Sequence, residues 1–276
     1  MEVDGACMLA QAGSQCVRQG QNGTTACWRP QLGFNRRMSI NRRQLCLAWL
    51  ATLASPLPAQ AQPERYTTGT ASADGIGRRH MGREIAGVMG WQAAPWLERE
   101  EREREERTDL LLAALALQPG MVVADIGAGS GYLARRMAPA VAPGGRVIAV
   151  DVQPQMVRML QRLAAQPGLA NLLPWLGEDK DVRLPAGQLD LAIMVDVYHE
   201  LAWPYEVLQS ILLALKPGGR LAFVEYKAED AFVPIKPLHK MSEAQIRREA
   251  EVHPLVWERT VSTLPWQHLV LFRKKA

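Results

Sequence analysis

The stretch Val123–Gly131 reads VADIGAGSG and joins a short apolar run to a loop with glycine at every second position. A short apolar run bounded by turn residues is typical of a buried strand. Glycine lets the chain turn sharply and leaves no side chain between the backbone and a ligand. A helix that begins after such a loop offers free N–H groups to an anion. The stretch therefore predicts a strand, a tight loop and a helix, with a ligand lying across the loop.

Similar apolar runs follow this stretch and alternate with amphipathic segments. We expect strands over 121–126, 146–150, 172–176, 189–195, 220–226 and 266–272, and helices over 132–138, 154–165 and 205–215. This alternation favours an α/β fold in which a mostly parallel sheet carries helices on both faces. In such a sheet, ligands bind at the carboxyl ends of the strands.

The spacing of the glycines separates two kinds of nucleotide site. A dinucleotide-binding loop needs its third glycine at position 132, where this chain has Tyr132. Asp151 ends the second expected strand, 24 residues after Gly127, where a carboxylate can accept both hydroxyl groups of a ribose. A lone aspartate here could instead cap the helix that begins at Pro154. Its distance from the glycine loop favours the ribose role.

Two further motifs complete an ordered set with the glycine loop and Asp151. They are DLAIMVDVYHEL at 190–201 and LKPGGRL at 215–221. In this order the set resembles the class I S-adenosylmethionine-dependent methyltransferases, over roughly residues 108–273. The resemblance implies a Rossmann-like, doubly wound sheet of seven strands whose last strand is antiparallel. It also implies S-adenosylmethionine as the cofactor.

The resemblance assigns roles within the expected cofactor site. The methionyl end would meet Asp125, Gly127, Ala128, Gly129 and Gly131, the ribose would meet Asp151, and the adenosine would meet Val152, Gln153 and Met156. Glu178 and Asp179 follow the third strand, where relatives place an acid against the adenine amine, although an exposed turn is the other interpretation. Asp196 ends the fourth strand, where relatives hold the methionine amine or the substrate.

The residues after the fourth strand supply the catalytic candidates. Methyl transfer from a sulfonium chiefly needs alignment and exclusion of water, and a neutral oxygen or nitrogen acceptor can also need a base. We expect His199 to be that base, because histidine titrates near neutrality, with Asp196 as its neighbour in the site. Glu225 and Tyr226 are further candidates. A structural histidine that bonds to the backbone is the other interpretation of His199.

The histidines and cysteines give no sequence signal for a metal ion. The histidines other than His199 are His80, His239, His253 and His268, and none has metal-ligand spacing to a neighbouring carboxylate. All four cysteines precede residue 62, at spacings that form no CxxC pair. We therefore expect no metal site.

Residues 62–107 form the expected leader and N-terminal helical cap of a methyltransferase domain at 108–276. Glycine, serine and threonine over 62–80 indicate an irregular leader. The next segment lies where relatives carry a cap over the cofactor, and Arg83 could reach the cofactor carboxylate. Alternating Glu and Arg over 98–107 predict the solvated start of a helix that continues to Leu117.

Residues 38–61 have the order of a secretory signal. A basic patch at Arg42-Arg43 precedes an apolar run over 45–54 and the small-residue pattern Ala59-Gln60-Ala61. The apolar run is too short to span a bilayer. We expect export to the periplasm, with cytoplasmic residence if the signal does not function. Residues 1–37 are expected to be disordered or to precede the true start at Met38.

Charge divides at the same point of the chain. Six basic and two acidic residues precede residue 62, whereas 26 of each follow it, so the body gives no electrostatic reason to expect a nucleic-acid partner. The sequence predicts a methyltransferase for an unidentified small-molecule acceptor, without a stable membrane span. The alternatives are a protein that binds adenosyl compounds without turnover and, less favoured, a nicotinamide-dependent reductase.

Overall fold

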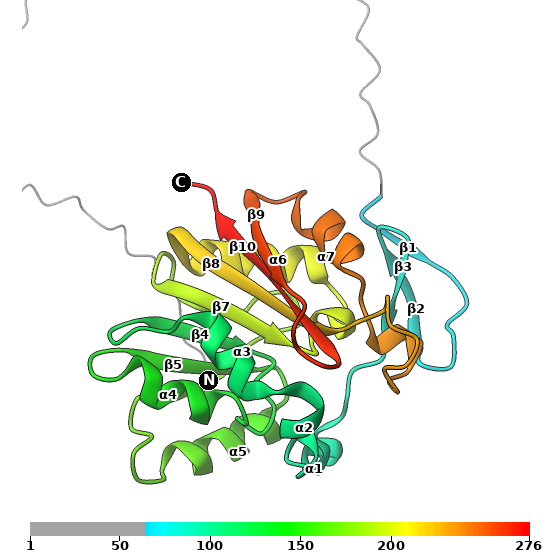
Figure 1. Ribbon diagram of the computed structural model, residues 1–276. Coiled ribbons are helices and arrows are strands. Elements are labelled where there is room, and N and C mark those ends of the chain that lie inside the picture. Colours follow the sequence, from blue (N-terminus) through cyan, green and yellow to red (C-terminus); the bar gives the residue numbers. More distant parts are fainter. Residues whose placement is uncertain (1–63) are drawn as a thin grey trace, which may run out of the picture. The chain divides into compact units, whose positions relative to one another are not determined.

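The computed structural model describes residues 64–276, and the strand that begins the stretch Val123–Gly131 lies at the centre of a seven-stranded sheet (Figure 1). The strands are β4 (Val122–Ile126), β5 (Arg146–Asp151), β6 (Leu172–Leu176), β7 (Leu189–Val195), β8 (Leu215–Tyr226), β9 (Leu255–Val261) and β10 (Gln267–Lys274). Their order is β6-β5-β4-β7-β8-β10-β9. β10 runs antiparallel to both of its neighbours, β8 and β9, and the other neighbouring pairs are parallel. The predicted mostly parallel sheet with an antiparallel last strand is confirmed.

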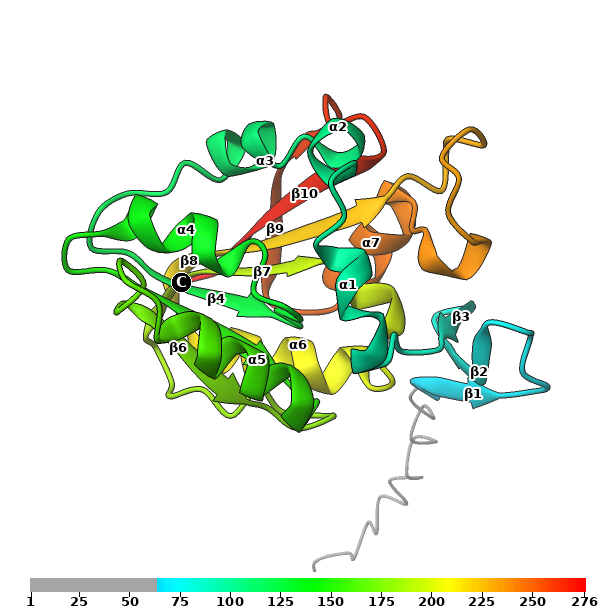
Figure 2. The ribbon, with the colours of Figure 1, turned by 90° about the horizontal axis from the view of Figure 1, so that it is seen from below.

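Helices cover both faces of this sheet, as predicted (Figure 2). They are α3 (Thr108–Leu115), α4 (Ala134–Val141) and α5 (Pro154–Ala164) on one face, and α6 (Pro204–Ala214) and α7 (Glu243–Ala250) on the other. Val123 packs with the first group and Ala124 with the second, so β4 is buried on both sides and reads as a continuous apolar run. The strand order reverses between β4 and β7, which places the glycine loop where such sheets bind ligands.

Residues 66–86 form a second sheet, which is antiparallel and has three strands. These are β1 (Tyr66–Thr68), β2 (Gly75–His80) and β3 (Arg83–Ala86). The predicted irregular leader over 62–80 is therefore wrong for residues 66–68 and 75–80, whereas the loop over 69–74 is irregular as expected. Met81 and Gly82 both have positive φ, 48° and 91°, and form the tight turn that suits a two-residue hairpin. The Glu84 carboxylate accepts two N–H groups of the β1–β2 region, which orders the intervening loop.

The chain between the two sheets forms η1 (Trp91–Ala93), α1 (Ala94–Leu97) and α2 (Arg102–Glu106). The predicted single helix from 98 to 117 is wrong, because Arg107 is left-handed (φ 50°) and separates α2 from α3. Its predicted solvated face is also wrong at two positions. Arg102 is 5% exposed, Glu106 is 1% exposed, and they form an ion pair of 2.7 Å. Arg102 and Glu106 therefore neutralise each other in the interior of the protein.

Gly131, at the end of the glycine loop, packs against α5. It has φ +84°, and a Cβ would lie 2.5 Å from Leu163 Cδ2 and 2.8 Å from Leu160 Cδ2. We expect Gly131→Ala to lower the free energy of unfolding by about 2–4 kcal/mol, because strained φ and overpacking add. Gly168→Ala is the matched control, since its φ is +83° but nothing lies within 4 Å of an added Cβ, and it should lose only about 1 kcal/mol. Urea unfolding measures both losses, and equal losses would exclude a packing effect.

The predicted N-terminal extension (1–37) and signal (38–61) lie outside the described residues, so both stay predictions. Within residues 64–276, no helix combines the length and apolar character needed to cross a bilayer.

Candidate functional site

A cavity of about 680 Å³ opens at the carboxyl edge of the large sheet, beside the glycine loop. Its wall comes from the segments that follow β4, β5, β6 and β7, from residues 87–107, called the cap segment below, and from the segment between β8 and α7. The volume lies within the range of about 300–1,000 Å³ that is usual for small-molecule sites. The predicted residues that line the cavity are Gly127, Gly129, Asp151, Val152, Gln153, Met156, Glu178, Asp179, Asp196, His199 and Tyr226.

Asp151 lies at the end of β5 and is held by the loops on either side. Its Oδ2 accepts the Gly129 N–H (3.0 Å), and its Oδ1 accepts the Gln153 N–H (2.8 Å). Each oxygen keeps a second lone pair for another donor. Burial raises the pKa of Asp151, and the two N–H donors oppose that rise. The N-cap of α5 is Gln153, so Asp151 is not the helix cap, and its carboxylate is free to accept two further hydroxyl groups.

Gly127 and Gly129 form the part of the loop that faces the cavity. Gly127 has φ +71°, and a Cβ there would lie 2.6 Å from Val197 Cγ2. Gly129 has φ +56°, and a Cβ there would lie 2.5 Å from Leu97 Cδ1 of the cap segment. Both positions suit glycine, because φ is positive and neighbouring side chains already touch the backbone.

Three residues that the resemblance places at the cofactor lie behind the cavity wall. Asp125 is inside β4 and 3% exposed, Ala128 packs against the core, and Gly131 faces α5. None of the three lines the cavity. The loop turns Gly127 and Gly129 toward the cavity, and the cofactor contacts of Asp125, Ala128 and Gly131 stay predictions.

The Asp125 carboxyl should make stability depend on pH. Burial raises its pKa from 3.8 to about 7, with the Asp151 charge adding to the rise and Arg102 opposing it. A raised folded-state pKa contributes stability that is full below about pH 4 and is lost as the pH rises through about 7. Between about pH 5 and pH 8, the free energy of unfolding of the wild type should fall by about 2–3 kcal/mol more than that of Asp125→Asn. Urea unfolding of both proteins at the two pH values measures this, and a constant difference would contradict it.

Asp196 follows β7 and combines two unusual features. Its backbone is left-handed, with φ 54°. Its Oδ2 accepts from Gln267 Nε2 (2.7 Å), but its buried Oδ1 has no hydrogen-bond partner among the described residues. Burial raises the pKa of Asp196 well above its ordinary value, and the Glu106 and Glu225 charges add to the rise. Such strain and an unpaired carboxyl oxygen on a cavity wall are typical of a ligand contact.

An ionic cluster near Asp196 was not predicted from the sequence. Arg99 and Arg102 line the cavity, and both donate to Glu106 (2.7 Å each). Glu106 also accepts the Tyr226 hydroxyl (2.9 Å). The two guanidinium groups at this end could attract a ligand carboxylate. The available signal was the alternating Glu-Arg run, which reads as a solvated helix unless its packing is known.

The cap segment is tied across the cavity by two side chains. Gln153 accepts the Trp91 N–H (2.8 Å) and donates to the Met89 carbonyl (2.9 Å). Glu200 Oε2 accepts the Met89 N–H (3.0 Å). These bonds fix the start of the cap segment at the cavity wall.

Arg83 does not line the cavity. Its guanidinium bonds both Glu249 oxygens (2.8 and 3.0 Å) and donates to the His199 carbonyl (3.1 Å). The expected contact with a cofactor carboxylate is therefore wrong. Arg83 instead fastens β3 to α7 and to the segment after β7.

The predicted adenosine contacts lie at the end of the cavity near β6. Met156 is 1% exposed and Val152 is exposed, and both present apolar groups to the cavity. Glu178 forms an ion pair with Arg183 (2.9 Å), which agrees with the exposed-turn interpretation for that residue. Asp179 is exposed on the same rim and stays the candidate partner of an adenine amine.

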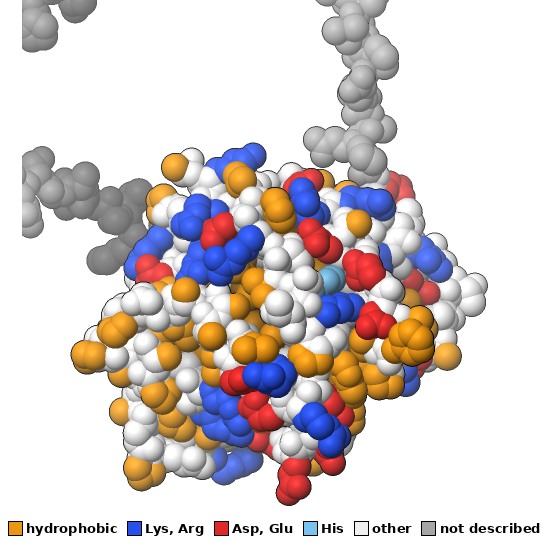
Figure 3. Space-filling view, viewed as in Figure 1, with side chains coloured by type: hydrophobic (Ala, Val, Ile, Leu, Met, Phe, Trp, Pro, Cys, Tyr) orange, Lys and Arg blue, Asp and Glu red, His pale blue; other side chains and the backbone are white. Residues whose placement is uncertain are grey.

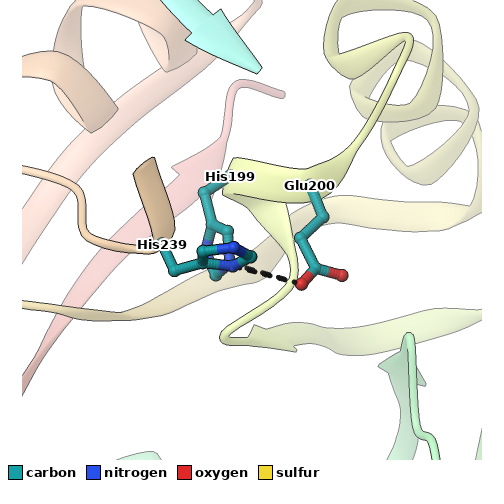
Figure 4. Close-up of side chains that lie close together, drawn as sticks. All are labelled: His199, Glu200 and His239. Carbon is teal, nitrogen blue, oxygen red and sulfur yellow. Dashed lines mark hydrogen bonds and ion pairs between the residues drawn. The ribbon is translucent and has the colours of Figure 1, made fainter. Parts of the chain in front are cut away.

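His199 lies on η2 (Tyr198–Glu200), is 2% exposed, and contacts three ionisable groups. Its Nδ1 is 2.6 Å from Glu225 Oε2. Its Nε2 is 3.2 Å from His239 Nδ1 and 3.6 Å from Glu200 Oε1, and Figure 4 shows these three side chains together. Burial alone would lower the pKa of His199, but Glu225 and Glu200 raise it to about 10. The carboxylates stabilise the charged ring and place its pKa above the near-neutral value expected from the sequence. The role of His199 as the catalytic base stays a prediction.

The surface charge agrees with the balance of the sequence. Figure 3 shows basic and acidic side chains interspersed on one face of the molecule. This mixture offers no broad basic face to a phosphate backbone on that side.

Comparison with known proteins finds similarity to methyltransferases. A family model described as a methyltransferase domain matches residues 124–221. The ubiquinone/menaquinone biosynthesis C-methyltransferase of Ectopseudomonas mendocina is 29% identical over 111 residues, which are 40% of this chain and 43% of that protein. The nocamycin O-methyltransferase of Saccharothrix syringae is 28% identical over 158 residues, 56% of this chain and 53% of that protein. The chain thus spans about half the length of these curated relatives, or less.

A solved structure gives wider coverage. The SAM-dependent methyltransferase of Aquifex aeolicus aligns with 67% of this chain and 99% of its own, at a TM-score of 0.64 and 25% sequence identity. The alignment therefore takes in essentially the whole of that protein.

Proposed function

We propose that this chain, which belongs to the class I S-adenosylmethionine-dependent methyltransferase family, transfers the methyl group of S-adenosylmethionine to a small-molecule acceptor. The observation that carries the proposal is Asp151, held against the glycine loop at the cavity with a lone pair free on each oxygen. The cavity volume and the cap segment support a small acceptor, and the balanced charge disfavours nucleic acid.

The cavity residues fit this cofactor. Asp151 would accept the ribose hydroxyls, and Met156 would pack against the adenosine. The unpaired Oδ1 of Asp196 would accept the methionine amine, and Arg102 would face the methionine carboxylate. S-adenosylmethionine supplies a methyl group on a positively charged sulfur, which is a good leaving group. The chain then mainly has to align the acceptor and exclude water.

The acceptor would occupy the opposite end of the cavity. That end is lined by His199, Glu200, Tyr226, His239 and residues 234–236. The cap segment closes over it through the Met89 bonds to Gln153 and Glu200. The two named relatives methylate carbon in one case and oxygen in the other, so the acceptor atom is left to experiment.

The test is a transfer assay with S-adenosylmethionine that carries a trideuterated methyl group. The full chain is incubated with separate phenol, quinol, alcohol, amine and thiol acceptors, and mass spectrometry follows S-adenosylhomocysteine and the labelled product. We expect both products to appear together with at least one acceptor class. At S-adenosylmethionine concentrations well below saturation, Asp151→Ala should form both products at least about tenfold more slowly. Binding without transfer to any class would favour the non-catalytic alternative. A thermal shift with NAD(P)H and none with S-adenosylmethionine would favour the reductase.

We also propose export directed by residues 38–61, on the strength of their signal-like order alone. Because the cofactor is made in the cytoplasm, export of the folded protein through a twin-arginine route would suit Arg42-Arg43 best. Mass spectrometry of the N-terminus from separated cell fractions tests this. A periplasmic chain that begins at Gln62 is expected, and an uncleaved cytoplasmic chain would refute export.

A further inference from the structure

Three side chains converge at the acceptor end of the cavity: His199, Glu200 and His239 (Figure 4). The distances are 3.2 Å between the two histidine nitrogens, 3.4 Å from His239 Nδ1 to Glu200 Oε1, and 3.6 Å from His199 Nε2 to that oxygen. A tetrahedral zinc ion with bonds of about 2.0–2.1 Å has ligand atoms about 3.3 Å apart. We propose that these three side chains form a binding site for Zn²⁺.

Glu225 orients His199 for this role. The His199 Nδ1 donates to Glu225 Oε2 at 2.6 Å, and Glu225 is fully buried. When Nδ1 donates to a carboxylate, His199 binds a metal through Nε2, which gives up its proton as the metal binds. This carboxylate–histidine pairing is the usual second shell of zinc sites. Glu225 Oε1 accepts the Tyr198 N–H (2.9 Å), so the carboxylate is itself fixed.

Glu200 is oriented as well, and nearby charge favours a cation. Its Oε2 is occupied by the Met89 N–H, which leaves Oε1 beside the two histidines. Glu200 and Glu225 together supply two negative charges next to the site. The Lys236 ammonium lies on the segment that carries His239, but its positive charge is paired with Asp74 (2.5 Å).

The ligand set distinguishes zinc from other cations. Mg²⁺ and Ca²⁺ prefer all-oxygen sites, whereas two imidazoles and one carboxylate suit zinc and similar first-row metals. Three protein ligands with an open fourth position are typical of catalytic rather than structural zinc. All three residues line the cavity, so an acceptor oxygen could take the open position. Binding of an acceptor oxygen at the open position rests on the proposed function, whereas the zinc site itself does not.

The expectation of no metal came from sequence spacing. His239 lies on η3 (Pro237–His239), 40 residues after His199, so no local motif joins the ligands. The topology brings them together, because the segment between β8 and α7 returns to the end of β7.

The test is calorimetric titration of the full chain with zinc chloride. The four cysteines are first alkylated, because their thiolates would also bind zinc. They are Cys7, Cys16, Cys27 and Cys46. We expect one Zn²⁺ per chain with a Kd below about 1 μM, and no heat with Mg²⁺. His239→Ala should weaken zinc binding at least about 100-fold, whereas Ile235→Val, on the same segment of the cavity wall, should not change it. Circular dichroism verifies that each variant is folded.

A second variant and a spectroscopic readout complete the test. Glu225→Gln should weaken zinc binding about 10- to 100-fold, as expected for a positioning residue. Cobalt(II) added in place of zinc should give the intense visible bands of tetrahedral coordination in wild type and lose them in His239→Ala. Absence of zinc binding, or equal affinity in wild type and His239→Ala, would overturn the site. Because S-adenosylmethionine binding is measured separately, that failure would leave the proposed function intact.

Discussion

We expect the Asp151→Ala chain to bind S-adenosylmethionine at least about tenfold more weakly than wild type. A charge-assisted contact is worth about 1.5–3 kcal/mol, which corresponds to roughly 10- to 150-fold in affinity. The loss should reach the upper part of this range, because Asp151 also anchors the Gly129 N–H and so orders the glycine loop. Isothermal titration calorimetry with S-adenosylmethionine and S-adenosylhomocysteine measures the effect.

Asp190→Ala is the matched control for this prediction. Asp190 lies at the opposite end of the sheet, pairs with Lys216 (2.6 Å) and does not line the cavity. Its removal should leave the affinity for S-adenosylmethionine unchanged. If Asp151→Ala folds and binds the cofactor as tightly as wild type, the ribose assignment fails.

Arg83→Ala should lower the free energy of unfolding by about 3–5 kcal/mol. Glu249 is fully buried, and the substitution would leave its carboxylate without the guanidinium that now bonds both oxygens. The affinity for S-adenosylmethionine should change by less than about threefold, because Arg83 does not line the cavity. Urea unfolding and calorimetry on the same protein give both values.

Arg79→Ala is the control for the general effect of removing an arginine from this sheet. Arg79 is half exposed and lies 3.6 Å from Glu84, so its loss should cost less than about 1 kcal/mol. The double variant Arg83→Met, Glu249→Gln should recover much of the lost stability, because no unpaired buried charge remains. A large loss of cofactor affinity in Arg83→Ala with little change in stability would instead restore the contact expected from the sequence.

The core of the fold could be predicted because its signals are local. The strands β6 and β7 begin and end where the apolar runs do, and the glycine loop follows β4 as its composition requires. Asp151 could be placed because strand ends gather at one edge of a parallel sheet. These inferences need only the pattern of apolar residues along the chain and the conformational freedom of glycine.

The remaining parts depend on contacts between distant segments. From the sequence alone, Arg102 and Glu106 are predicted to lie on a solvated helix face. In the fold they pair with each other, and Tyr226 at the end of β8 donates to Glu106. Gly131 belongs to the same glycine motif as Gly127, yet only packing shows that it faces α5. His239 carries no local motif at all. A single sequence does not encode such pairings in any short pattern.

The most direct test of the account is a crystal structure of the full chain with S-adenosylhomocysteine. The account predicts that both ribose hydroxyls lie within hydrogen-bond distance of the Asp151 carboxylate and that the amine lies against Asp196 Oδ1. A nucleoside bound elsewhere, or turned so that its ribose leaves Asp151 unpaired, would contradict it.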